Sequence, residues 1–147
     1  MTPRHFTELR CWQLADELRR EVVAICAIER VRRRRRFCDS FEDAAGSVCR
    51  NISEGFARFD SGPIVQFFGY ALGSLQEVED HLRSVSLERS STSPAFDRLW
   101  DLAEHTKATT LNFKRTHEKP EHEKPTRKRV RKKRPPDPSA PNSQPNH

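Results

Sequence analysis

The sequence predicts an all-α protein: an antiparallel up-down four-helix bundle with a disordered basic C-terminal tail. Apolar residues recur at spacings of three and four along four segments, which is the period of an amphipathic helix. The chain has only 5 glycines and few β-branched runs, which disfavours a sheet. Residues 116–147 hold seven of the 10 prolines and almost no apolar side chain, so they cannot bury enough surface to fold. We therefore expect a bundle over residues 1–115 and a tail over residues 116–147.

The first two helices are expected over about residues 7–30 and 40–58. Thr7 is a suitable N-cap for the first helix. The second begins with Ser40-Phe41-Glu42-Asp43, which has the form of a capping box. Between the two helices lie five consecutive arginines, Arg32 to Arg36. Their mutual repulsion disfavours burial, so this run is expected to form an exposed connector or a charged helix end.

The third and fourth helices are expected over about residues 63–88 and 93–115. Each begins with a proline, Pro63 or Pro94, at a position where a helix tolerates it. Gly69 and Gly73 lie inside the third helix, where each costs up to about 1 kcal/mol relative to alanine. We therefore expect another helix to approach closely at these two glycines. Short connectors between four amphipathic helices favour the up-down arrangement.

Composition excludes several classes of protein. No run of apolar residues is long enough to span a membrane, and charged residues interrupt the N-terminal segment where a signal peptide would need an apolar core. The four cysteines, Cys11, Cys26, Cys38 and Cys49, contain no C-x-x-C pair, so neither a zinc module nor a disulfide framework is indicated. The sequence thus predicts a cytoplasmic protein with reduced thiols, no metal and no cofactor.

Basic segments are the main functional signal of the composition. The formal net charge is +6, and the predicted tail carries +5 of it. Two dense cationic runs predict contact with a nucleic-acid backbone through counterion release. The alternatives are a solubilising tail or, in a eukaryotic host, a nuclear-import address. The candidate nucleic-acid-binding residues are Arg32, Arg33, Arg34, Arg35, Arg36, Arg127, Lys128, Arg129, Arg131, Lys132, Lys133 and Arg134.

A polar line on the second predicted helix allows two interpretations. Ser47, Asn51, Glu54 and Arg58 share one helix face. They form either an active-site face or a structural network in which Glu54 pairs with Arg58 four residues later. The structural interpretation is favoured, because no nucleophile or second carboxylate motif accompanies them.

No catalytic constellation is recognisable elsewhere in the sequence. The serines lack a G-x-S-x-G setting, and the two mid-helix glycines do not follow a strand as a phosphate-binding loop requires. Glu77 and His81 have the spacing of two metal ligands on one helix face, but two ligands do not make a site. We therefore expect a protein that is not an enzyme.

Two segments resemble a known family, the 23S rRNA intervening sequence proteins. They are NISEGFARF, Asn51 to Phe59, and ALGSLQEVE, Ala71 to Glu79. The resemblance covers about residues 5–115. Departures from the usual pattern are Ser53 in place of alanine, Leu72 where a polar or basic residue is common, and the arginine run in the connector. The residues that match the signature, expected to be structural, are Ser47, Asn51, Glu54, Gly55, Arg58, Gly73, Ser74 and Glu77.

The resemblance implies a bacterial or phage-like four-helix bundle that assembles into a ring, commonly described as a pentamer. Relatives include the accessory variability determinants of diversity-generating retroelements, which partner a reverse transcriptase and RNA. Phe56, Phe59, Phe67 and Phe68 also widen the apolar stripes and favour a homo-oligomer. The predicted function is a self-associating bundle that contacts RNA. The alternative is a scaffold or accessory subunit for a reverse transcriptase.

Overall fold

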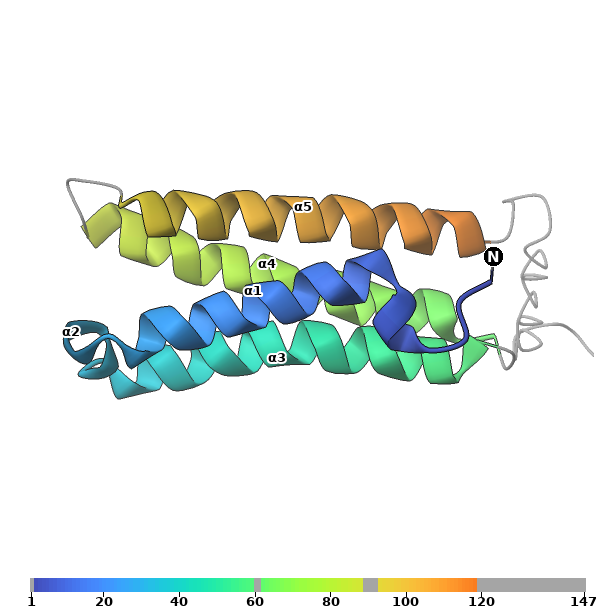
Figure 1. Cartoon of the computed structure of the whole chain (residues 1–147), viewed down its shortest axis with the longest axis horizontal. Helices are drawn as coiled ribbons and strands as arrows, with labels where there is room; N and C mark the ends of the chain where they lie inside the picture. Colours follow the sequence, from blue (N-terminus) through green and yellow to red (C-terminus); the bar gives the residue numbers. More distant parts are fainter. Residues whose placement is uncertain (1, 60–61, 89–92, 119–147) are drawn as a thin grey trace, which may run out of the picture.

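The computed structural model describes residues 2–59, 62–88 and 93–118, and this part of the chain is helical (Figure 1). The elements are η1 (Phe6–Glu8), α1 (Arg10–Ala27), α2 (Glu29–Arg32), α3 (Arg35–Ala57), α4 (Ile64–Glu88) and α5 (Pro94–His117). Among the described residues no strand occurs, and the all-α prediction is confirmed for them. None of these helices is long and apolar enough to cross a membrane.

Four long helices, α1, α3, α4 and α5, lie along the long axis of the molecule (Figure 1). α3 packs against both α1 and α4, and α5 packs against both α4 and α1. Each long helix therefore has two neighbours, and the four enclose one core. The short α2 lies at one end of the molecule, whereas the N-terminal segment and the end of α5 lie at the other (Figure 1).

The core consists of apolar side chains that recur every three or four residues on each long helix. Burying such a side chain contributes roughly 1.5–3 kcal/mol. The largest fully buried side chains include Leu14, Leu18, Phe41, Ile52, Phe68, Leu75, Leu82 and Leu99, which come from all four long helices.

The first predicted helix is interrupted twice. Leu9 and Ile28 both have extended backbone conformations, so the expected helix over residues 7–30 is divided into η1, α1 and α2. Thr7 is not the cap of α1. It lies within η1, and Leu9 occupies the N-cap position without a side-chain hydrogen bond. Leu9 is only 3% exposed, so burial of an apolar side chain takes precedence over capping here.

The second predicted helix begins five residues earlier than expected. α3 starts at Arg35, so Ser40 lies inside the helix and the capping-box prediction is wrong. Ser40 Oγ instead lies 3.1 Å from Nε2 of His81 on α4. The helix extends backward because Cys38 is buried and the Phe37 and Phe41 rings pack 5.4 Å apart. The first turn of α3 therefore contains two of the five arginines.

The predicted close approach at Gly69 and Gly73 is also wrong. A Cβ at Gly73 would meet nothing within 4 Å, and one at Gly69 would make an ordinary contact of 3.8 Å with Lys114 Cε. The tight position is Gly55 on α3, where a Cβ would lie 3.0 Å from Phe67 Cβ and from Phe68 Cδ2. α3 and α4 thus approach each other closely near the connection between them.

The C-terminal boundary of the helical part lies slightly beyond the expected one. α5 continues to His117, whereas the prediction ended the bundle at Arg115. The remainder of the predicted tail, residues 119–147, lies outside the described residues.

Candidate nucleic-acid interface and signature face

The five arginines of the candidate interface are exposed at the end of the molecule occupied by α2. Arg32 ends α2, the next two arginines form the connector, and Arg35 and Arg36 open α3. Arg33 Nη2 lies 3.3 Å from Glu29 Oε1, and both side chains are largely exposed. The guanidinium carbon of Arg34 lies 4.6 Å from the centre of the Phe37 ring.

Three of these five arginines border two separate pockets. Arg32 and Arg35 border an open pocket together with Asp39 and Glu42. Arg34 borders a second pocket that is mainly apolar, together with Arg30. The run is therefore concentrated at one end of the molecule but does not form one continuous cationic stripe.

The second cationic run is not placed by the structure. Its members, Arg127, Lys128, Arg129, Arg131, Lys132, Lys133 and Arg134, lie outside the described residues. The chain leaves α5 at the end of the molecule opposite to α2 (Figure 1). α5 has 24 residues, so these two ends are separated by about 36 Å.

Three signature residues form a hydrogen-bonded link between α3 and α4. Ser74 Oγ donates to Ser47 Oγ at 3.0 Å across the helix contact. Asn51 Nδ2 donates to the same hydroxyl at 3.1 Å and to the Ser47 carbonyl at 2.9 Å. A bond between two helices fixes how far one is shifted along the other, so this network sets the register of α3 against α4.

The remaining signature side chains lie along the same α3–α4 contact or open toward solvent. Glu54 Oε1 accepts from Arg58 Nε at 2.5 Å, with 44% and 53% of the two side chains exposed. The Arg58 guanidinium also lies 5.4 Å from the centre of the Phe67 ring. Glu77 is exposed, 4.0 Å from His81 Nε2. The described residues contain no group of three or more His, Cys, Asp or Glu placed to hold a metal ion.

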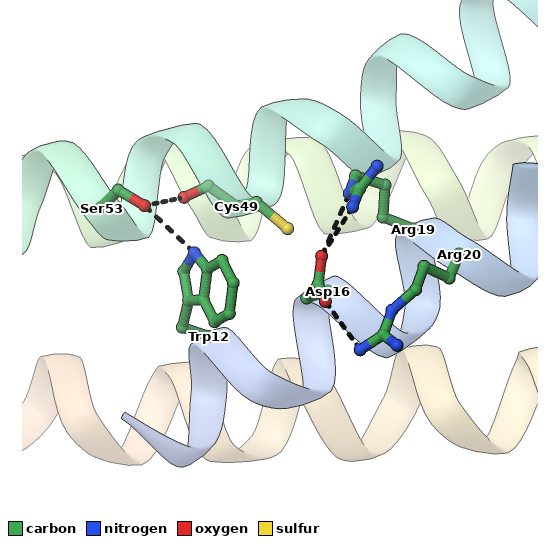
Figure 2. Close-up of polar contacts among 6 residues, drawn as sticks. All are labelled: Trp12, Asp16, Arg19, Arg20, Cys49 and Ser53. Carbon is green, nitrogen blue, oxygen red and sulfur yellow. Dashed lines mark hydrogen bonds and ion pairs between the residues drawn. The ribbon is translucent and has the colours of Figure 1, made fainter. Parts of the chain in front are cut away.

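A polar contact between α1 and α3 was missed from the sequence (Figure 2). Trp12 Nε1 donates to Ser53 Oγ at 3.1 Å, and Ser53 donates to the Cys49 carbonyl at 2.8 Å. Trp12 was interpreted only as an apolar member of the first helix. The signal that could have indicated the contact is Ser53 itself, a hydroxyl at a position noted above as a departure from the alanine of the resembled pattern.

Next to this contact, Asp16 lies between two arginines of its own helix (Figure 2). Its carboxylate lies 2.8 Å from Arg19 Nη2 and 2.7 Å from Arg20 Nη2. The hydrogen bond from Arg19 is the main reason that the pKa of Asp16 lies below its usual value. Burial raises the pKa of the neighbouring Cys49 thiol to about 11, so the thiol is protonated at neutral pH.

A second missed interaction joins α4 to α5. Lys107 Nζ lies 2.8 and 3.0 Å from the two carboxylate oxygens of Glu79, which is only 6% exposed. Glu79 follows Leu75 by four residues and precedes Leu82 by three, so the helical period places it beside the core. A carboxylate at such a position needs a partner, and this signal was present in the sequence.

Comparison with known proteins decides the family. The family model for the 23S rRNA-intervening sequence protein matches residues 7–112, from η1 through most of α5. The chain belongs to this family. The match includes both signature segments, so the resemblance predicted from them is confirmed. No curated protein and no solved structure matches the chain.

Proposed function

We propose that this member of the 23S rRNA-intervening sequence protein family is a cytoplasmic, non-enzymatic protein that binds RNA through its arginine-rich end. On this proposal, α1, α3, α4 and α5 form an antiparallel up-down bundle that associates with copies of itself. The family match over residues 7–112 is the observation that carries the proposal, because an rRNA sequence is part of the family's name.

The charge at the α2 end supports RNA contact. Arg32 to Arg36 are all exposed, and Glu29, which pairs with Arg33, is itself 88% exposed. An exposed ion pair of this kind contributes little energy, so a phosphate can displace it at small cost. Such contacts recognise the backbone rather than the bases.

The contacts of the signature face support a non-enzymatic role. Ser47, Asn51 and Ser74 bind one another and the helix backbone, and Glu54 pairs with Arg58. A catalytic group would need its reactive atom directed at a substrate, whereas these polar atoms bind one another within α3 or, at Ser47 and Ser74, join α3 to α4.

Exposed aromatic side chains support self-association. Phe59 is 44% exposed and Tyr70 is 51% exposed. Phe68, one of the four phenylalanines that widen the apolar stripes, is completely buried within the chain. The surface available to a second copy therefore includes Phe59, Phe67 and Tyr70 rather than all four phenylalanines, and by family resemblance the assembly is a pentamer.

The test is the salt dependence of binding to a fluorescently labelled single-stranded RNA. The wild-type chain is compared with a variant in which Arg32 to Arg36 are all glutamine. If all five cations contact phosphates, log affinity plotted against log salt should lose about 3.5 units of slope in the variant. An unchanged slope would show that this end does not contact RNA. Binding that requires an added reverse transcriptase would favour an accessory-subunit role.

Light scattering of the same two proteins tests self-association separately. A particle several times the 17.1 kDa mass of the chain is expected for both, because the glutamine substitutions lie away from Phe59 and Tyr70. A monomer at tens of micromolar would contradict self-association and leave the RNA result intact.

A further inference from the structure

Two of the four cysteines meet at the α2 end of the molecule. Cys26 lies in the last turn of α1 and Cys38 in the first turn of α3. These two helices pack against each other and lie side by side at this end (Figure 1). Both cysteines are free and line the same open pocket, which has a volume of about 470 Å³. Residues 27–37, which include α2 and the arginine run, connect them.

The Cys26 and Cys38 side chains interact directly. Burial raises the pKa of the Cys26 thiol to about 12, and the next cause is a side-chain hydrogen bond with Cys38, followed by the charges of Cys38 and Glu42. The Cys38 thiol lies 3.4 Å from the Val31 carbonyl, so it is directed toward the connector. Thiols that already interact need only a small movement of the helix ends to reach the S–S distance of about 2.05 Å.

The other two cysteines have different neighbours. Burial raises the pKa of both Cys11 and Cys49 to about 11. After burial, the backbone of Trp12 acts on Cys11, whereas Asp16 and Arg19 act on Cys49. Burial is therefore common to all four thiols, and the mutual contact is what distinguishes Cys26 and Cys38.

We propose that Cys26 and Cys38 are a dithiol that a peroxide oxidises to a disulfide, which fixes the connector between α1 and α3. Cys38, the more exposed of the two at 6% against 2%, reacts first. Its sulfur bonds to one peroxide oxygen, the O–O bond breaks, and water leaves. The Cys26 sulfur then attacks the sulfur of the Cys38 sulfenic acid, the S–O bond breaks, and a second water leaves. The chain thus loses two hydrogen atoms and two electrons, and the peroxide is reduced to water.

The raised pKa of Cys26 sets the character of this pair. A thiol whose thiolate is not stabilised favours the disulfide at equilibrium. It also reacts slowly at neutral pH, because the thiolate is the nucleophile. The pair therefore responds to sustained oxidation and not as a rapid sensor. The chemistry uses the two thiols and not the arginines that border the pocket, so it does not depend on the proposed RNA contact.

Mass spectrometry of the full-length chain after treatment with hydrogen peroxide tests the bond. The chain should lose the mass of two hydrogen atoms, and peptide mapping should join Cys26 to Cys38. Dithiothreitol should restore the original mass. Absence of a link, a link that involves another cysteine, or a link between two chains would overturn the proposal.

Two double variants test the assignment of the two thiols. Cys11→Ala with Cys49→Ala should still form the bond, whereas Cys26→Ala with Cys38→Ala should lose no hydrogen. In Cys26→Ala alone, Cys38 should remain a sulfenic acid that dimedone traps. Circular dichroism shows whether each variant is folded, and peptide mapping of the wild-type chain decides the assignment if one is not. Disulfide formation in the double variant that lacks Cys26 and Cys38 would refute the assignment.

The stability of the oxidised chain tests whether the disulfide fixes the connector. It closes a loop in the unfolded chain, so oxidation should raise the melting temperature by about 5 °C or more. Hydrogen exchange of residues 28–34 should slow at the same time, and dithiothreitol should reverse both effects. A Cys26–Cys38 link that leaves the melting temperature and the exchange unchanged would show that the connector is not fixed and would overturn the proposal.

Discussion

Asp16 gives the pH dependence of stability a specific source. Its carboxylate is held by Arg19 and lies beside Arg20, and its pKa is lowered in the folded chain. A carboxylate with a lowered folded pKa stabilises the protein above its unfolded pKa, about 3.9. That contribution is lost as the pH falls through the folded pKa. The arginines are 43% and 70% exposed, so the effect is limited by solvent screening.

We expect Asp16→Asn to lower the free energy of unfolding at pH 7 by about 1 kcal/mol or less. The difference from wild type should shrink as the pH is lowered below 4 and the wild-type carboxylate becomes protonated. Urea unfolding of both proteins at pH 7, 5 and 3 measures this difference in the free energy of unfolding. Asp101→Asn on the exposed surface of α5 is the control. A difference that persists undiminished at pH 3 would show that Asp16 acts through packing rather than charge.

At the scale of helices, the sequence predicted which segments are helical much better than where they end. Apolar spacing identifies α3, α4 and α5, because burial of one face is a property of the whole helix. The predicted start of α3 was wrong because Ser40 has a good local capping pattern, whereas the Phe37 ring packs 5.4 Å from that of His81 on α4 and Cys38 is buried in the core that the long helices share. Local patterns do not contain such contacts.

The glycines also show that local sequence patterns do not reveal contacts between helices. The sequence places Gly69 and Gly73 inside a helix and predicts a cost, but it does not show which neighbour faces them. In the structure the close neighbour is at Gly55, where Phe67 and Phe68 of α4 leave no room for a side chain. The polar links of the candidate site, such as Ser47 to Ser74, likewise depend on the register of two helices.

Gly55→Ala and Gly73→Ala should therefore have opposite effects. Either alanine gains up to about 1 kcal/mol of helix propensity. At Gly55 the Cβ would lie 3.0 Å from Phe67 Cβ, and moving α4 away should cost about 1–3 kcal/mol, which leaves a net loss. The Cβ added by Gly73→Ala would have no neighbouring atom within 4 Å, so this substitution should raise the melting temperature.

Thermal unfolding of both glycine variants, at a concentration where the oligomeric state has been measured, shows whether each substitution raises or lowers the melting temperature. A stabilised Gly55→Ala would contradict the close approach of α3 and α4. If Gly73→Ala lowers the melting temperature only at high protein concentration, the open side of α4 lies against another copy.

At the scale of the whole molecule, we expect the charge of the predicted tail to affect RNA binding without affecting the stability of the folded part. Deleting residues 119–147 removes nine Lys and Arg but leaves every helix of the described part complete. The melting temperature should therefore change little. If the seven cations of Arg127 to Arg134 neutralise phosphates on a single strand, the salt slope of RNA binding should flatten by about 2 to 5 units.

A full-length variant with those seven cations replaced by glutamine separates charge from length, and it should reproduce the flattened slope. An unchanged slope in both proteins would assign the tail a solubilising role and leave RNA binding to the helical part. A large fall in melting temperature on truncation would show instead that the deleted residues contribute to the folded structure.

The placement of α2 and the end of α5 at opposite ends makes the subunit polar along its axis. Copies that associate side by side with parallel axes would gather every Arg32–Arg36 run on one rim of the ring and every chain exit on the other. Antiparallel neighbours, which a closed ring accommodates throughout only with an even number of subunits, would alternate the two on each rim. The geometry of assembly therefore decides whether an RNA strand meets a continuous collar of arginine or a discontinuous one, even though each subunit carries the same charge.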